Sequence, residues 1–175
     1  GNFFISFALA TALGMFAGLV NGLLVTKIGI PSIVATIGTL FFWRGLVNVI
    51  SQGSGIAIVD EADGTWHHTI FVDKLFDTIP AQFIWFVALT GLMQWVYRYH
   101  KFGNHIHFVG DNKASAQMMG IDVDRVKIIA FVQLGFFSAL AGIFTMYEML
   151  YFWPTQGSGL MLTTLAAVFV GGTSV

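Results

Sequence analysis

The sequence contains no cysteine, which excludes disulfides and thiolate metal sites. Charge is also scarce, because Lys, Arg, Asp and Glu make up 10% of the 175 residues, against about 25% in soluble domains. The chain therefore lacks the polar surface that a globule in water needs. It has no Gly-x-x-x-x-Gly-Lys-Ser/Thr pattern for binding ATP, and no basic face outside one loop that would suit a nucleic acid.

Long apolar segments are present instead, since 56% of the residues are hydrophobic. The first, 5–25, would span about 31 Å as a helix, which matches a hydrocarbon core of about 30 Å. We predict an all-α, polytopic transmembrane bundle of four full helices and part of a fifth, at about 5–25, 33–50, 81–97, 126–147 and 160–172. Both ends of the chain lie in apolar sequence, so we interpret it as a fragment of a longer protein.

The second segment, 33–50, is expected to be broken or irregular. It would span about 27 Å as a straight helix, barely enough to cross a bilayer, and it contains Gly38, Gly45 and Arg44. A charge at the bilayer centre costs about 2.5–3.5 kcal/mol, so such residues usually face protein or water. Arg44 could line a pathway with Glu148 as its partner, or it could snorkel outward or hold a helix break.

The connecting segments differ in charge. Residues 98–127 hold five of the eight Lys and Arg residues, whereas 51–80 carries five acidic residues and one lysine. Because cytoplasmic loops of membrane proteins are enriched in Lys and Arg, we predict that 98–125 is cytoplasmic and that 51–80 is an outer loop.

Small residues follow one face of the first segment. Gly14, Gly18 and Gly22 recur every four residues, which allows another helix to approach closely. We interpret this face as a packing seam, with Asn21 beside it as a hydrogen-bonding residue.

The basic loop contains a short predicted helix, 113–119. Asn112 can cap it and Gly120 can end it, and Ala114, Gln117 and Met118 fall on one face. From periodicity alone, this helix could either insert into a groove on a cytosolic partner or lie on lipid headgroups.

The remaining histidines and serines form no pattern that predicts a metal site or a catalytic site. His67 and His68 are adjacent and would point apart, and His105 and His107 have no Cys or carboxylate in register, so we expect no metal ion and no cofactor. The Gly-Ser-Gly turns at 53–55 and 157–159 have no strand–helix context and no partner histidine, so no catalytic residue is predicted.

Short motifs run along nearly the whole chain in a specific order: Asn21–Lys27, Ile30–Leu40, Arg44–Gly45, Phe102–His105, Val109–Ile121 and Ala166–Ser174. In order and spacing they resemble permease subunits of ribose/xylose-type ABC transporters, in the branched-chain amino-acid/ribose permease superfamily. The chain departs from that pattern where Ser115 interrupts an Ala-Ala pair, at His105 and His107, and in the loop 51–80, which matches only loosely.

The resemblance implies a partial permease domain over 1–175, in a bacterial inner membrane, that carries a small sugar and is not an enzyme. It also implies three partners, namely an ABC ATPase, a second permease subunit and a periplasmic sugar-binding protein at the outer face. The ATPase would dock on the coupling loop residues Asp111, Asn112, Lys113, Ala114, Ser115, Ala116, Gln117 and Gly120. Candidate residues for the translocation path are Asn21, Thr36, Thr39, Arg44 and Asn48.

Two rival functions stay open at this point. One is a permease of the same superfamily for branched-chain amino acids or for a sugar-like autoinducer. The other is an intramembrane enzyme that uses His and Ser residues, which ATP-dependent uptake would distinguish from a transporter.

Overall fold

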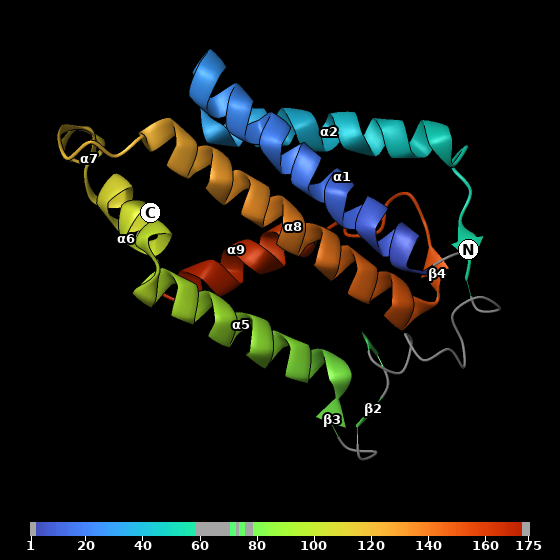
Figure 1. Ribbon diagram of the computed structural model, residues 1–175. Coiled ribbons are helices and arrows are strands. Elements are labelled where there is room, and N and C mark those ends of the chain that lie inside the picture. Colours follow the sequence, from blue (N-terminus) through green and yellow to red (C-terminus); the bar gives the residue numbers. More distant parts are fainter. Residues whose placement is uncertain (1–2, 59–70, 73, 76–78, 173–175) are drawn as a thin grey trace.

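The computed structural model describes residues 3–58, 71–72, 74–75 and 79–172 (Figure 1). The predicted all-α class is confirmed, and the strands in the described residues have two residues each. The helices are α1 (Phe3–Leu23) with its π-helical extension η1 (Leu24–Ile28), α2 (Ser32–Ile50), α5 (Ala81–Tyr99), α6 (Lys101–Asp111), α7 (Lys113–Met118), α8 (Val123–Met149) and α9 (Leu160–Val170).

Three described helical segments are long and apolar enough to cross a membrane: Phe3–Ile28, Ser32–Ile50 and Val123–Met149. In the apolar windows of these segments only 11%, 6% and 6% of the residues are buried, so most of their apolar surface faces outward, as lipid contact requires. Helix α5 is as long as α2 but more polar, and α9 has 11 residues.

Helices α1 and α8 form the closest pair in the fold and lie side by side (Figure 1). Gly14, Gly18 and Gly22 all face α8, where their Cα atoms come against the backbone or the first side-chain atoms of that helix. A Cβ at Gly18 would overlap the carbonyl oxygen of Phe131, and Gly135 of α8 meets Gly14 in the same way. Such close contact requires that these three positions of α1, and Gly135 of α8, carry no side chain.

The expected break in the second segment is wrong, because α2 is one continuous α-helix from Ser32 to Ile50. Glycine costs only about 1 kcal/mol relative to alanine in a helix, and a segment in lipid must satisfy its backbone internally. The irregular turn lies instead at the end of α1, where η1 ends at Gly29 with φ 82°.

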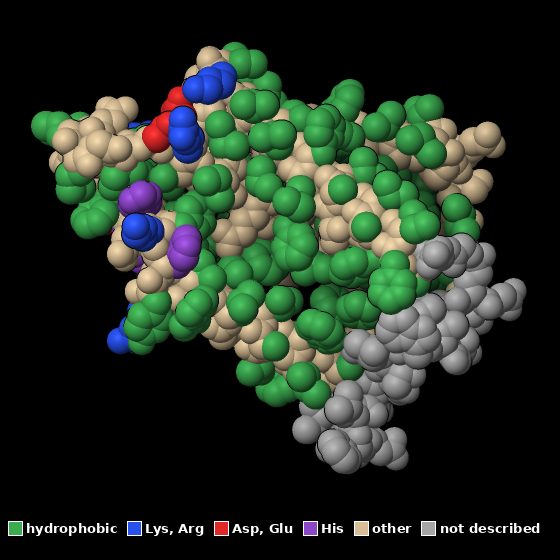
Figure 2. All heavy atoms as spheres, viewed as in Figure 1, with side chains coloured by type: hydrophobic (Ala, Val, Ile, Leu, Met, Phe, Trp, Pro, Cys, Tyr) green, Lys and Arg blue, Asp and Glu red, His purple; other side chains and the backbone are tan. Residues whose placement is uncertain are grey.

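The two ends of the molecule differ in polarity. At one end η1, α6, α7 and the start of α8 meet, and Lys, Arg, Asp and His side chains gather there (Figure 2). At the other end β1 (Ile56–Ala57) pairs antiparallel with β4 (Tyr151–Phe152), and near it β2 (Lys74–Leu75) pairs with β3 (Ile79–Pro80). The acidic residues of the loop 51–80 and the pair His67–His68 lie outside the described residues.

Candidate functional site

The basic loop is a folded unit built around Ala116. This residue is 0% exposed and packs with Val109, Val123 and Val126. Phe102, Ile106 and Ile121 lie against the same cluster. The loop is therefore held rigidly against the first turns of α8, because its buried side chains come from α6, α7 and α8 together.

Both ends of α7 are defined by local hydrogen bonds. The Asn112 side-chain oxygen accepts hydrogen bonds from the backbone N–H groups of Ala114, at 2.9 Å, and Ser115, at 3.1 Å. Gly120 then adopts φ 78°, and Ile121 N–H donates to the Ala116 carbonyl at 3.0 Å. Asn112 and Gly120 thus act as the cap and the terminator that their residue types predict.

The predicted coupling-loop residues differ in their exposure to solvent. Ala116 faces the interior, so it is not available to a partner protein. Asp111, Lys113, Ala114, Ser115, Gln117 and Gly120 are exposed, and Met118 is 82% exposed. The outer surface of α7 is therefore formed by Lys113, Ala114, Gln117 and Met118.

Ion pairs connect the loop to the long helices. Asp122 caps α8 by accepting from Arg125 N–H at 3.1 Å, and its other oxygen lies 2.7 Å from Arg125 Nε. Lys27 Nζ, just after α1, lies 3.0 Å from Asp124 Oδ2 in the first turn of α8. Each exposed pair contributes little stability, but the second pair shows that the end of α1 lies beside the base of the loop.

A second polar site lies between α1 and α2. Thr39 Oγ1 donates to Asn21 Oδ1 at 2.7 Å, and this bond is partly buried. Thr36 lies one turn away, where its hydroxyl donates to the Ser32 carbonyl of its own helix at 2.9 Å. Of the five candidate path residues, the structure therefore brings Asn21 and Thr39 into contact.

Arg44 and Asn48 form a separate group toward the other end of α2. Asn48 Nδ2 donates to the Arg44 backbone carbonyl at 3.0 Å. The suggested pair of Arg44 with Glu148 is not formed in the part of the chain that the structure describes, because Glu148 Oε2 accepts from Gln82 Nε2 of α5 at 3.3 Å. Glu148 lies at the far end of α8, so it connects that helix to α5.

An aromatic cluster at this end has no predictive signal in the sequence. Phe71, from the segment between α2 and α5, stacks on Phe7, Trp85 and Tyr147 at ring distances of 6.0, 5.8 and 6.2 Å. Those three rings come from α1, α5 and α8. Phe71 therefore joins α5 to the packed α1–α8 pair at this end, a contact between distant parts of the chain that only the tertiary structure reveals.

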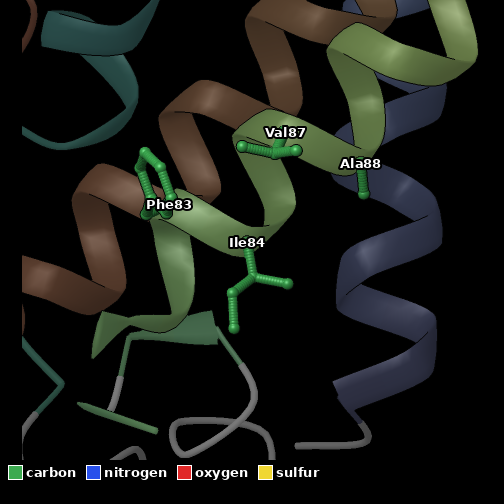
Figure 3. Close-up of a pocket in the computed structure, with 4 residues that line it drawn as sticks. All are labelled: Phe83, Ile84, Val87 and Ala88. Atoms are coloured by element: carbon green, nitrogen blue, oxygen red, sulfur yellow. The ribbon is translucent and has the colours of Figure 1, made fainter. Parts of the chain in front are cut away.

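The cavities are shallow and lie on outward helix faces. Phe83, Ile84, Val87 and Ala88 line an apolar groove of about 290 Å³ on α5 (Figure 3). A groove of about 190 Å³ on α8 is lined by Lys127, Ala130, Phe131 and Leu134. Neither groove includes a candidate path residue, and among the described residues no three His, Cys, Asp or Glu side chains group as a metal site would require.

Comparisons with known proteins show the family to which the sequence is similar. Residues 1–175 match the family described as "Branched-chain amino acid transport system / permease component". The chain is 34% identical over 175 residues to the "Autoinducer 2 import system permease protein LsrC" of Photorhabdus luminescens, which covers 99% of the chain and 51% of the relative.

Two further relatives carry the same description. The protein of Photorhabdus laumondii is 35% identical over 173 residues, covering 98% of the chain and 50% of the relative. That of Yersinia pseudotuberculosis serotype O:3 is 35% identical over 167 residues, covering 95% and 46%. The chain thus spans about half the length of the curated relatives it matches, and no solved structure matches it.

Proposed function

The chain belongs to the family of branched-chain amino acid transport system permease components, and on that premise we propose that it forms part of the membrane subunit of an ATP-driven importer. The subunit lies in the bacterial inner membrane and catalyses no reaction itself. A separate ABC ATPase supplies the energy, a second permease subunit completes the translocation path, and a periplasmic binding protein delivers the solute.

The capped helix α7 is the observation that carries this proposal. Its buried residue Ala116 anchors it to α8, while Ala114 and Met118 face outward. A rigid helix with a small, shallow outer face suits insertion into a groove on another protein. The sequence alone left open a helix lying on lipid, but the loop packs as a unit with α6 and α8, which supports the docking interpretation.

Movement of the ATPase would reach the membrane through two connections. The Ala116 cluster transmits a push on α7 directly to Val123 and Val126 of α8. The Lys27–Asp124 pair connects the same turn of α8 to the end of α1. Since α1 and α8 are in close contact along their glycines, the two helices would move together.

Replacing Ala114 with Phe in the assembled transporter tests the coupling role. We expect the solute-stimulated rate of ATP hydrolysis to fall by roughly tenfold, a typical size for coupling between sites, because the ring would block the docking face without entering the core. Asn104→Phe is the matched control, since Asn104 is exposed on α6. Equal stimulation in Ala114→Phe and in the unmodified transporter would rule out docking through this face.

For the solute we propose a small sugar or a sugar-like autoinducer. The similar proteins are described as autoinducer 2 import permeases, and polar contacts between α1 and α2, such as Asn21–Thr39, suit a hydroxylated solute. Because the family description refers to branched-chain amino acids, that solute class is the alternative. Measuring ATP-dependent uptake of labelled monosaccharides, autoinducer 2 and leucine by the whole transporter decides between these solutes. Uptake of leucine alone would overturn the sugar assignment. Chemical conversion of a solute without ATP would instead indicate an enzyme.

A further inference from the structure

The indole of Trp43 in α2 carries a buried N–H group that has no hydrogen-bond acceptor among the residues that the structure describes. An indole nitrogen can only donate, and burial without an acceptor is unfavourable because the N–H loses water and gains no partner. The other described side-chain nitrogen in this condition belongs to Gln156, in the turn between β4 and α9. Trp43, by contrast, lies in a helix that is long and apolar enough to cross the membrane.

Trp43 lies within the span of α2 rather than at one of its ends. Along the helix axis it follows Ser32 by roughly 16 Å and precedes Ile50 by roughly 10 Å. Tryptophans at a membrane surface direct the N–H to water and headgroups, but protein encloses the Trp43 Nε1 atom. The hydrocarbon interior itself offers no acceptor. An acceptor therefore has to come from something that enters the space beside α2.

The groups around the indole come from α1 and α2. The Trp43 ring meets Phe16 of α1 in a T-shaped contact, with 6.4 Å between the ring centroids. Thr39 lies one turn before Trp43 on the same face of α2, and its hydroxyl donates to the Asn21 side-chain oxygen of α1 at 2.7 Å. Aromatic rings, an N–H donor, a hydroxyl and an amide thus gather along one contact. Sites for small polar molecules combine apolar walls with a few polar groups in this way.

The contact of α2 with α1 is looser than the contact of α8 with α1. Gly38 and Gly45 of α2 have open space around them, whereas Gly18 of α1 lies directly against the backbone of α8. The helices α1 and α2 also diverge toward the end of the molecule that carries β1 and β4 (Figure 1). Side chains rather than backbones therefore connect α2 to α1. A movement of α2 away from α1 would expose the indole N–H with little loss of packing.

We infer that Trp43 is a specificity-determining residue of the translocation path, whose buried N–H donates to a hydroxyl or carbonyl oxygen of the solute when α2 moves away from α1. This inference rests on the proposed transport function and narrows its solute class. A donor without a partner in the protein disfavours a solute that brings no acceptor, because the N–H then stays unpaired. A sugar-like solute offers several acceptors, whereas the side chain of a branched-chain amino acid offers none.

Trp43→Phe in the assembled transporter tests the inference, since it removes the N–H and keeps an aromatic ring beside Phe16. With the binding protein saturated, we expect the rate of ATP-dependent uptake of labelled ribose or autoinducer 2 to fall by roughly fivefold, the size expected for one hydrogen bond. Trp95→Phe is the matched control, because it makes the same change at a tryptophan of α5 that is 60% exposed. This control should keep full uptake.

A second variant removes the N–H while nearly preserving the ring size. Stop-codon suppression can replace the Trp43 indole with its benzothiophene isostere, which has sulfur in place of the N–H group. Uptake should fall as in Trp43→Phe, while the Tm of the full-length permease should stay unchanged or rise, because the lost donor had no partner.

Unchanged uptake with the isostere would overturn the inference. A lower Tm would also overturn it, since the N–H would then have an acceptor elsewhere in the full-length permease. If the unmodified transporter takes up neither ribose nor autoinducer 2, the proposed function itself is contradicted, so the two failures can be told apart.

Discussion

At the scale of single residues, position on a short helix decides what each side chain can do. Ala114 and Ala116 are two residues apart and chemically identical, yet Ala116 is fully buried and Ala114 is exposed. The same bulky substitution therefore tests a different property at each of the two positions. At Ala114 it tests docking, whereas at Ala116 it would disrupt packing against Val109 and Val126.

The Asn21–Thr39 bond leads to a prediction at this scale. Thr39→Val removes the donor and leaves the amide oxygen of Asn21 without it, whereas Thr145→Val removes a hydroxyl that donates to the Ala141 carbonyl of its own helix, α8. Hydrogen bonds between membrane helices average about 0.6 kcal/mol, so the loss of stability should be small. We therefore expect Thr39→Val to lower solute uptake by the whole transporter severalfold while leaving its thermal stability nearly unchanged. Thr145→Val serves as the control, and equal uptake by both variants would exclude the Asn21–Thr39 contact from the path.

At the scale of elements, one helix pair organises the described part of the chain. The contacts between α1 and α8 are made by glycines and backbone, and α2 joins the pair through the Asn21–Thr39 bond. Helix α5 is attached to α8 by Gln82–Glu148 at one end and by Gln133–Met93 further along. Trp85 of α5 also joins the aromatic cluster around Phe71. These attachments are scattered along α5, whereas the glycines of the α1–α8 seam recur in three successive helical turns.

Gly18→Ala should reveal this difference. The added Cβ would overlap the Phe131 carbonyl, so the helices must separate, and overpacking of this kind costs about 1–3 kcal/mol. Gly38→Ala, on α2, has open space around it and should leave stability unchanged or raise it by up to about 1 kcal/mol. Thermal unfolding of the purified full-length permease compares them. If the Gly18→Ala protein is as stable as the Gly38→Ala protein, then close packing of α1 on α8 at Gly18 is contradicted.

At the scale of the whole molecule, the two ends differ in composition and in structure. One end carries α6, α7 and the ion pairs at Asp122 and Asp124, and the other carries the paired strands β1 and β4. Positive charge gathers on the cytoplasmic side of membrane proteins, so we propose that the end with α7 is cytoplasmic and is the side on which an ATPase would dock. All the described helices that could cross the membrane connect these two ends.

The absence of cysteine makes this topology directly testable. Ser54 follows the end of α2 and Asn104 lies on α6, and these elements end at opposite ends of the molecule (Figure 1). Both residues are exposed, so each can carry a single cysteine in a full-length protein cleared of other cysteines. A membrane-impermeant maleimide should label Ser54→Cys in intact cells and Asn104→Cys only after permeabilisation. The reverse pattern would invert the topology and remove α7 from the reach of a cytosolic ATPase.

The sequence by itself determined the class of the molecule and most of its helices, because these depend on local properties. Apolar length and scarcity of charge predicted a membrane-spanning bundle, and the helix starts and ends near Pro31, Pro80, Asn112 and Gly120 follow from backbone chemistry that neighbouring residues decide. The break expected in α2 was wrong because glycine weakens a helix only slightly when the membrane demands internal hydrogen bonds.

Only the tertiary structure decided which residues meet. The burial of Ala116, the stacking of Phe71 on rings from three helices and the partner of Glu148 all depend on segments that are far apart in the chain. A periodic pattern shows that a helix has an apolar face, but in a membrane protein nearly every face is apolar. Hydrophobicity therefore cannot indicate which face meets protein and which meets lipid, and the helices must be placed beside one another to distinguish them.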